Sequence, residues 1–263
     1  LRKGKYIGTV KTSEATAQSL TDMMVGRAVS LNIDRPDPVD PKPRLKIEGL
    51  TCVDNLGIKR LDDVTFTAMS GEILGIAGIA GSGQRELLEC ITGLYPVEHG
   101  TVTFLPEGKP AQQLIGKTPN QIRKAGVAMA FVPEDRLGMG LVGSMGMADN
   151  MMLKTYRSGR GPLLDRKPPR QLAERVKEEL DVLTPSINTP VRRLSGGNVQ
   201  KVLVGREIAS SPTLLMTAYA VRGLDINTSY TIYNLLTAQK LKGVAVIYVG
   251  EDLDVLLELC DRI

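Results

Sequence analysis

The 263-residue sequence contains no tryptophan, and aromatic residues make up only 4% of it. It also lacks any stretch dense in lysine and arginine, and its formal net charge of +4 is modest for this length. Surfaces that bind nucleic acid combine clustered basic residues with aromatic side chains that stack on bases. The composition therefore predicts that nucleic acid is not a partner of this chain.

Metal-binding residues are equally scarce. The cysteines, Cys52, Cys90 and Cys260, are far apart, and the single histidine, His99, lies in a segment whose glycine indicates a turn. Structural zinc sites require closely spaced Cys and His pairs. We therefore expect no metal site from these residues, and we expect the cysteines to be reduced core thiols of a cytosolic protein.

Long apolar runs are missing as well. No stretch approaches the roughly 18–20 apolar residues of a membrane-spanning helix, and residues 1–5 lack the apolar core of a signal peptide. The sequence starts without methionine and stops at residues 261–263 without a terminating signal. We expect it to be part of a longer chain, truncated at its C-terminus.

Changes in composition divide the sequence into three parts. Residues 1–34 form a tail in which polar and apolar residues partly alternate at helical spacing. Residues 35–43 contain four prolines with interspersed charges, which excludes a helix or a central strand and indicates an extended linker. The main domain is then expected to occupy residues 44–263.

Within the main domain, apolar strands alternate with helices. The stripe Leu172, Val176, Leu180 and Leu183 supports one of these helices. Strands that are apolar nearly throughout are typical of a parallel sheet covered on both faces. The sequence therefore predicts an α/β fold with a mostly parallel sheet flanked by helices. The predicted strands include residues 72–77, 127–132, 214–216 and 244–249, and the predicted helices residues 86–94, 147–155, 168–183, 199–209, 229–240 and 253–259.

A glycine-rich loop follows the first of these strands. Its G-x-x-x-x-G frame runs from Gly78 to Gly83, and such a loop points backbone N–H groups and a helix N-terminus at phosphate oxygens. The motif continues with Lys and Ser/Thr, but here Gln84 and Arg85 follow. Arg85 either touches a phosphate or pairs with Glu89 one helical turn on, and the pairing is favoured. The candidate nucleotide-binding residues are Gly78, Gly81, Ser82, Gly83, Gln84, Arg85 and Glu86.

A second motif lies about 115 residues further along the chain. Ser195 and the two glycines after it place a hydroxyl and backbone N–H groups at a helix N-terminus, where an anion is favoured. This string resembles the signature motif of ABC ATPases. Residues 222–225 resemble the D-loop of that family, residues 131–136 its Q-loop segment and residues 246–253 its switch loop. The matching residues are Leu194, Ser195, Gly196, Gly197, Asn198 and Gln200 in the signature and Asp225 in the D-loop.

The resemblance covers essentially the whole chain. The Glu134-Asp135-Arg136 string and the Gly-Gly-Asn form of the signature are similar to the second, C-terminal cassette of tandem ATPases that serve bacterial simple-sugar and nucleoside importers. Residues 23–27 are similar to the segment that closes the first cassette. The resemblance implies a P-loop NTPase-like sheet with an antiparallel β subdomain and a helical subdomain at about 137–210. It also implies that residues 1–34 end a preceding cassette.

Several positions that carry hydrolysis in this family are substituted. The resemblance places Ala218 and Tyr219 at the metal-binding Asp and the polarising Glu, Glu251 at the switch-loop His and Glu134 at the Q-loop Gln. No aromatic residue occupies the adenine-stacking region around residues 54–57. Phosphoryl transfer depends on positioning and charge neutralisation. We therefore expect no intact catalytic residue in this half, near-background hydrolysis, and Mg²⁺ bound weakly or not at all.

The resemblance also implies a composite mechanism. Two cassettes face head to tail, so Ser195, Gly196 and Gly197 would contact ATP held by the first cassette, with Asp225 at the seam. The expected partners are that cassette, transmembrane permease subunits and, indirectly, an extracytoplasmic substrate-binding protein, at the cytoplasmic face of a bacterial membrane. Two alternatives stay open: a non-hydrolytic nucleotide-binding regulatory module, and a soluble ABC ATPase without a permease. The choice between nucleoside and simple sugar is open too.

Overall fold

The computed structural model describes residue 1 and residues 4–26, 33–125, 127–156 and 164–263. It separates into two compact units, residues 1–34 and 35–263. The smaller unit holds a short 3-10 helix η1 (Thr12–Glu14) and helix α1 (Ala17–Val25). The Thr16 hydroxyl accepts a hydrogen bond from Ser19 N, and the Ser19 hydroxyl accepts one from Thr16 N. These reciprocal bonds satisfy N–H groups that the start of α1 would leave free.

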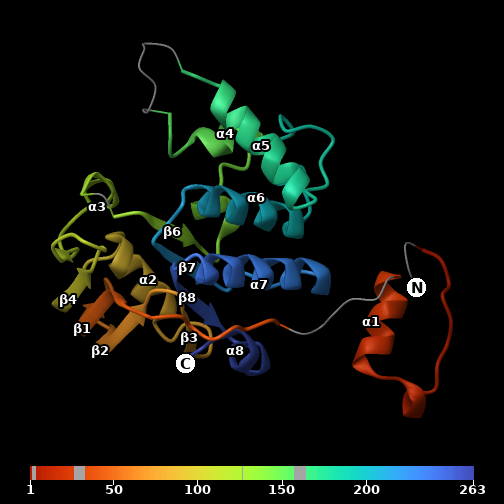
Figure 1. Cartoon of the computed structure of the whole chain (residues 1–263), viewed down its shortest axis with the longest axis horizontal. Coiled ribbons are helices and arrows are strands. Elements are labelled where there is room, and N and C mark those ends of the chain that lie inside the picture. The colour runs from red at the N-terminus through yellow and green to blue at the C-terminus, as the bar shows by residue number, and fades with distance from the viewer. Residues whose placement is uncertain (2–3, 27–32, 126, 157–163) are drawn as a thin grey trace. The chain divides into compact units, whose positions relative to one another are not determined.

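The larger unit is built on two sheets (Figure 1). The antiparallel sheet has the order β2 (Lys59–Met69), β1 (Pro43–Val53), β4 (His99–Phe104) and β5 (Gln112–Gln113). The parallel sheet has the order β3 (Ile73–Ala77), β8 (Ala245–Gly250), β7 (Leu214–Ala218) and β6 (Met129–Val132). The helices are α2 (Gln84–Thr92), α3 (Pro119–Lys124), the π-helix η2 (Arg136–Gly140), α4 (Met147–Met152), α5 (Lys167–Glu179), the 3-10 helix η3 (Val191–Arg193), α6 (Gly196–Ala209), α7 (Ile226–Leu241) and α8 (Leu253–Leu259). The predicted fold class is confirmed.

The parallel sheet forms the centre of the core. Strands β7 and β8 are buried along their whole length, because helices α2, α6, α7 and α8 pack on the sheet. Leu215 pairs with Val246 and Met216 with Ile247, and burial of each such side chain contributes about 1.5–3 kcal/mol. Since all strands of this sheet run parallel, their carboxyl ends meet at one edge. The loops that follow them therefore gather in one place.

The antiparallel sheet corrects one prediction. His99 begins strand β4, so the prediction of a turn there is wrong. Gly100 has φ of +98°, and a Cβ at this position would lie 2.5 Å from the carbonyl oxygen of Gly49. The glycine therefore serves the close approach of β4 to β1. Further along the same pair of strands, buried Phe104 lies opposite buried Leu45.

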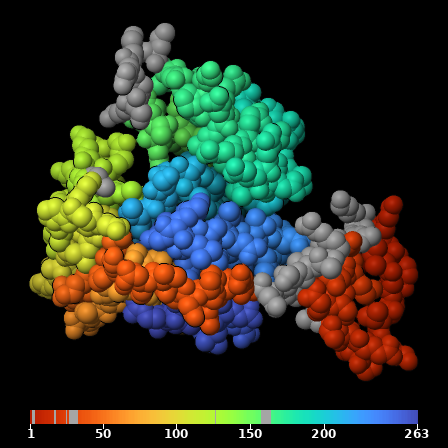
Figure 2. All heavy atoms as spheres, viewed as in Figure 1, coloured from red at the N-terminus to blue at the C-terminus, as the bar shows by residue number. Residues whose placement is uncertain are grey.

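Helices α4 and α5 form a further layer that packs on α6. Figure 2 shows the atoms of α4 and α5 gathered in one lobe that rests on α6. A Cβ at Gly205 in α6 would lie 2.6 Å from Val176 of α5, so this glycine lets the two helices approach closely. The predicted stripe does not extend to Leu183, which is 71% exposed, because the chain turns at Asp181 with φ of +47°. None of the helices in the described ranges is long and apolar enough to cross a membrane.

The thiols give a first testable prediction. Cys52, Cys90 and Cys260 are unpaired and at most 3% exposed. Burial raises the pKa of all of them, that of Cys260 to about 12. Because the thiolate is the reactive form, we expect the folded chain to leave a disulfide reagent such as DTNB unreacted at neutral pH. In guanidinium chloride, every thiol should react within minutes. A thiol that titrates rapidly without denaturant would contradict the buried placement.

Candidate functional site

The loop between β3 and α2 exposes backbone N–H groups at the start of a helix. Gly81 and Gly83 have φ of +87° and +94°, and a Cβ at Gly83 would lie 2.2 Å from the Arg60 carbonyl oxygen. Only glycine fits that position. Gly83 is also the N-cap of α2 and provides no side-chain hydrogen bond, while Gly81 and Ser82 are exposed. The free N–H groups and the positive end of the helix dipole suit an anion.

Gln84 folds back inside this loop. Its side chain is 5% exposed, and its Nε2 donates a hydrogen bond to the Ile79 carbonyl oxygen at 3.1 Å. A Cβ at Gly78 would lie 2.0 Å from that Nε2, so glycine makes room for the amide. The Gln84 Oε1 is buried without a hydrogen-bond partner. A neutral amide thus occupies the interior of the loop.

Arg85 turns away from the loop and along α2. Its Nε donates to Glu89 Oε1 at 2.7 Å, and this hydrogen bond raises the pKa of the guanidinium. The favoured prediction of an Arg85–Glu89 pair is therefore confirmed. Glu86 lies in the first turn of α2, where a negative charge interacts favourably with the helix dipole. No hydroxyl follows the loop at the position that the phosphate-binding motif reserves for one.

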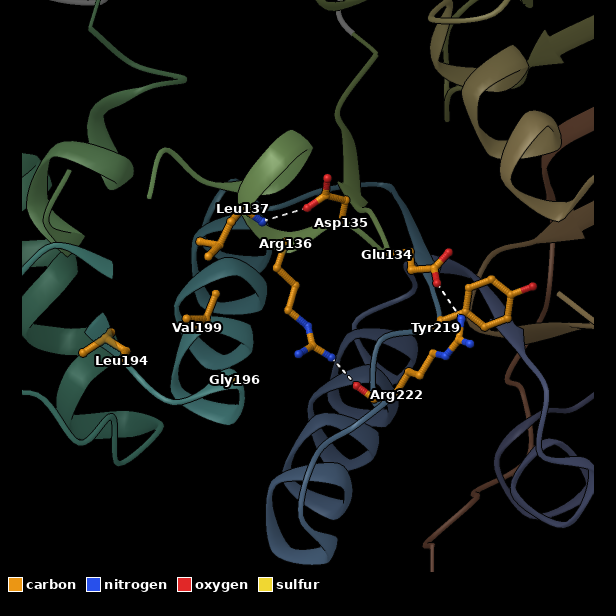
Figure 3. Close-up of a pocket in the computed structure, with 9 residues that line it drawn as sticks. All are labelled: Glu134, Asp135, Arg136, Leu137, Leu194, Gly196, Val199, Tyr219 and Arg222. Carbon is orange, nitrogen blue, oxygen red and sulfur yellow. Dashed lines mark hydrogen bonds and ion pairs between the residues drawn. The ribbon is translucent and has the colours of Figure 1, made fainter. Parts of the chain in front are cut away.

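A buried aromatic residue, Tyr219, directly follows the end of β7. Ala218 is 3% exposed and Tyr219 is 6% exposed. Tyr219 has φ of +50°, and its backbone N donates to the Val249 carbonyl oxygen at 3.0 Å. Its hydroxyl points away from Arg222 (Figure 3) and is buried without a partner. Burial, with the nearby charges of Glu251 and Glu134, raises the pKa of Tyr219, so the hydroxyl keeps its proton.

Arg222 joins two carboxylates at the same edge of the sheet. Its Nη1 lies 2.6 Å from Glu134 Oε1 and 3.7 Å from Glu251 Oε1, and its guanidinium lies 5.8 Å from the centre of the Tyr219 ring. Glu134 follows β6, Arg222 follows β7 and Glu251 follows β8, so the parallel sheet brings together residues that are distant in sequence. We call Glu134, Arg222 and Glu251 the carboxylate cluster.

The signature-like string forms the start of α6. Ser195 is the N-cap, and its Oγ accepts hydrogen bonds from Asn198 N at 3.4 Å and from Asn198 Nδ2 at 2.9 Å. Asn198 Oδ1 in turn accepts a bond from Leu183 N at 2.9 Å. Ser195 and Gly196 are exposed, whereas Gln200 is 1% exposed and its amide atoms have no partner. The N-terminus of α6 is therefore exposed at Ser195 and Gly196, while the hydrogen bonds of Asn198 fix the first turn of the helix.

Asp225 is the N-cap of α7 and lies beside the start of α6. Its Oδ1 accepts from Thr228 N at 3.1 Å and its Oδ2 from Thr228 Oγ1 at 2.7 Å. Burial by itself would raise the pKa of Asp225, but these hydrogen bonds hold it below its usual value. A Cβ at Gly197 would lie 3.1 Å from Thr228 Oγ1 and 3.5 Å from Asp225 Oδ2. The glycine lets the two helix starts pack together.

A cavity of about 490 Å³ lies between the start of α6 and the loops at the sheet edge (Figure 3). Arg136 crosses it and donates a hydrogen bond to the carbonyl oxygen of Arg222, and burial lowers the pKa of Arg136. Arg136 and Arg222 are not among the site residues predicted from the sequence. The sequence feature that could have predicted both as site residues is an arginine in a loop that follows a buried strand. The lining residues are Glu134, Asp135, Arg136, Leu137, Leu194, Gly196, Val199, Tyr219 and Arg222.

Comparison with known protein families identifies this arrangement. The family model described as ABC transporter matches residues 61–217, which run from β2 of the antiparallel sheet through the loop between β3 and α2 and helix α6 into β7. The chain belongs to the ABC transporter family. Residues 61–217 include the loop at Gly78–Gly83, the start of α6 and the carboxylate Glu134.

Curated relatives of this ABC transporter domain are ATP-binding proteins named for import. A glucose import ATP-binding protein of Haloferax volcanii and a guanosine import ATP-binding protein of Bacillus subtilis are each 36% identical to it over 100% of the chain. A xylose import ATP-binding protein of Pectobacterium atrosepticum is also 36% identical over 100% of the chain. The chain spans about half the length of these relatives, 48%, 51% and 51% respectively.

Solved cassettes share the fold of this ABC transporter domain. A dimeric bacterial ABC transporter cassette matches with a TM-score of 0.68 and 23% identity, covering 80% of this chain and 89% of that one. A nucleotide-free cassette matches with a TM-score of 0.67 and 23% identity, covering 83% and 85%. The two-sheet arrangement with a layer of helices beside it is therefore the ABC cassette fold.

Proposed function

We propose that this chain is the second ATP-binding cassette in the ATPase subunit of an importer for simple sugars or nucleosides. The observation that carries the proposal is the contrast between two loops. The start of α6 exposes Ser195 and Gly196, while the chain's own phosphate loop is followed by Gln84 and Arg85, and β7 ends at Ala218 and is followed by Tyr219. The import names of relatives that are about twice as long support this reading.

The proposed organisation follows the division of the chain. Residues 1–34 would end the first cassette, residues 35–43 would link the two, and residues 44–263 would form the second. At the start of the proposed linker, Arg35 donates hydrogen bonds to the carbonyl oxygens of Leu257 and Cys260 at 2.8 and 2.7 Å. These bonds hold the first residue of the linker against the end of α8. The helical layer, at about 137–210, would dock permease subunits at the cytoplasmic face of a bacterial membrane. A substrate-binding protein would act on the other side.

In this proposal the two ATP sites of the subunit are unequal. ATP on the phosphate loop of the first cassette would be covered by Ser195, Gly196 and Gly197 and hydrolysed there, with Asp225 at the seam. The site on this chain's own loop would hold nucleotide without turnover. Loss of one preorganised charged or hydrogen-bonding group typically costs about 10²–10³ in rate. In this proposal the site on this chain lacks three such groups at once: the lysine of the loop, and the metal-binding and polarising carboxylates at the end of β7.

A substitution at the loop tests the unequal sites. Gln84→Lys restores the charged group of the motif but leaves Ala218 and Tyr219 unchanged. We therefore expect the substituted chain to release phosphate from ATP and Mg²⁺ no faster than the unsubstituted chain, and both to remain at the level of buffer alone. The full two-cassette protein serves as the positive control in the same assay. Robust turnover by the unsubstituted chain would refute the proposal that its own site is inactive.

A further inference from the structure

The phosphate loop of this chain offers donors for a phosphate group together with buried polar groups that lack partners. The N–H groups at the start of α2 have no side-chain cap. Gln84 and Tyr219 are 5% and 6% exposed, and the Gln84 Oε1 and the Tyr219 hydroxyl have no hydrogen-bond partner. Gln84 points into the loop itself, with its Nε2 on the Ile79 carbonyl oxygen. Buried polar atoms without partners are rare in folded proteins. The Tyr219 O–H can donate to a phosphate oxygen, whereas the Gln84 Oε1 is an acceptor and cannot.

The same edge of the sheet carries negative charge a short way along. Two carboxylates, Glu134 and Glu251, share the single guanidinium of Arg222, which leaves a formal charge of about −1 on the cluster. Asp135 and Arg136 line the cavity beside the cluster and carry opposite charges, so together they leave the net charge there unchanged. A phosphate chain that extended from the loop toward this cluster would meet carboxylates, and like charges repel. The cluster therefore penalises each phosphate group added beyond those that the loop holds.

The residues around the loop do not fit a divalent cation either. Mg²⁺ prefers oxygen ligands in octahedral geometry. Arg85 stands where the motif has a hydroxyl and is engaged with Glu89, and Ala218 at the end of β7 has no side-chain oxygen. In the parts of the chain that the structure describes, no group of three or more His, Cys, Asp and Glu side chains could hold a metal ion. A cation at the loop would therefore find no side-chain oxygen at residues 85 and 218.

We propose that the phosphate loop of this chain selects a nucleoside diphosphate over a triphosphate and binds it without a divalent cation. The proposal rests on the proposed function, in which this loop holds a nucleotide, and it adds the class of nucleotide. The loop N–H groups and the helix dipole bind the diphosphate. The carboxylate cluster rejects the third phosphate, and the buried Tyr219 ring fills the space beside the loop where an acidic side chain would hold metal and water.

Titration calorimetry on the chain with ADP and ATP, each in Mg²⁺ and in EDTA, tests this proposal. We expect ADP to bind at least about tenfold more tightly than ATP, and EDTA to change the affinity for ADP by less than about twofold. The double variant Glu134→Gln/Glu251→Gln removes the repelling charges, so it should tighten ATP binding about tenfold and leave ADP binding nearly unchanged. The matched control is Glu178→Gln/Glu179→Gln, which removes two exposed carboxylates from α5 and should change neither affinity.

The outcomes of this titration distinguish the preference for a diphosphate from nucleotide binding by the loop itself. If ATP with Mg²⁺ binds as tightly as ADP, and EDTA abolishes that binding, the diphosphate preference is wrong while the loop remains a nucleotide site. If neither nucleotide binds, the role of the loop as a nucleotide site fails as well. The comparison of ADP with ATP on the unsubstituted chain needs no variant. Circular dichroism of the double variant shows whether its affinities refer to a folded protein.

Discussion

Replacement of Ser195 by arginine in the full two-cassette protein is expected to lower the rate of ATP hydrolysis by at least about 100-fold. Ser195 is the exposed N-cap of α6, and the proposed function places it against the nucleotide of the other cassette. An arginine there would fill the space that the nucleotide needs and would remove the hydroxyl. Steady-state phosphate release, with nucleotide binding measured in parallel, gives the loss in rate.

Two further substitutions at the same position separate catalysis from folding. Ser195→Thr keeps a hydroxyl and a capping group and should retain most of the activity. Ser195→Asp also caps a helix well, so the protein should keep its Tm, but the carboxylate would face phosphate and activity should fall as in the arginine variant. Full activity in Ser195→Arg would rule out a composite site that includes this signature loop.

Glu207→Leu is expected to destabilise the chain by about 3–5 kcal/mol, because it leaves a buried arginine without its carboxylate. Glu207 is completely buried. Its Oε1 accepts two hydrogen bonds from Arg206, at 3.0 and 2.9 Å, while its Oε2 accepts one from Phe131 N at 3.1 Å and contacts Lys154 Nζ. The carboxylate therefore ties α6 to β6 and to the segment after α4. For a chain of this size, the loss corresponds to a fall in Tm of roughly 6–20 °C.

Denaturant unfolding followed by circular dichroism measures this loss. Glu179→Leu is the matched control, since Glu179 is exposed on α5, and it should change the free energy of unfolding by less than about 0.5 kcal/mol. Replacing both partners, in Arg206→Met/Glu207→Leu, should recover part of the stability, because no unpaired charge remains buried. A loss below about 1 kcal/mol in Glu207→Leu would show that the network contributes little.

The sequence predicts those features correctly for which the deciding interactions are local. The Arg85–Glu89 pair is four residues apart on one helix, and that spacing brings the side chains together in any helix. Strands β7 and β8 were recognised because a strand buried on both faces has apolar residues in a row. The start of α6 was recognised from Ser195 and the glycines after it, which are themselves the cap.

The sequence predicts a feature wrongly where a segment distant in the chain decides the local conformation. Gly100 suggests a turn when its neighbours alone are considered, yet its conformation serves contact with Gly49, and β4 exists only because β1 lies beside it. Leu183 continues the helical stripe of α5 in the sequence, but it is exposed because the chain turns before it. Strand pairing and helix ends depend on such partners, which residue spacing does not contain.

The sequence by itself determined the family and the residues of the candidate site: a glycine loop followed by Gln84 and Arg85, a string that resembles the signature motif, and Ala218 and Tyr219 at the end of a buried strand. Only the tertiary structure decided what these residues do together. Arg222 meets Glu134 and Glu251 because parallel strands end at one edge, and the backbone of Tyr219, which is buried, is held by a hydrogen bond to Val249 of β8. Residue identity is a local property, whereas the charge and space that a ligand encounters are set by segments that only the folded sheet brings into contact.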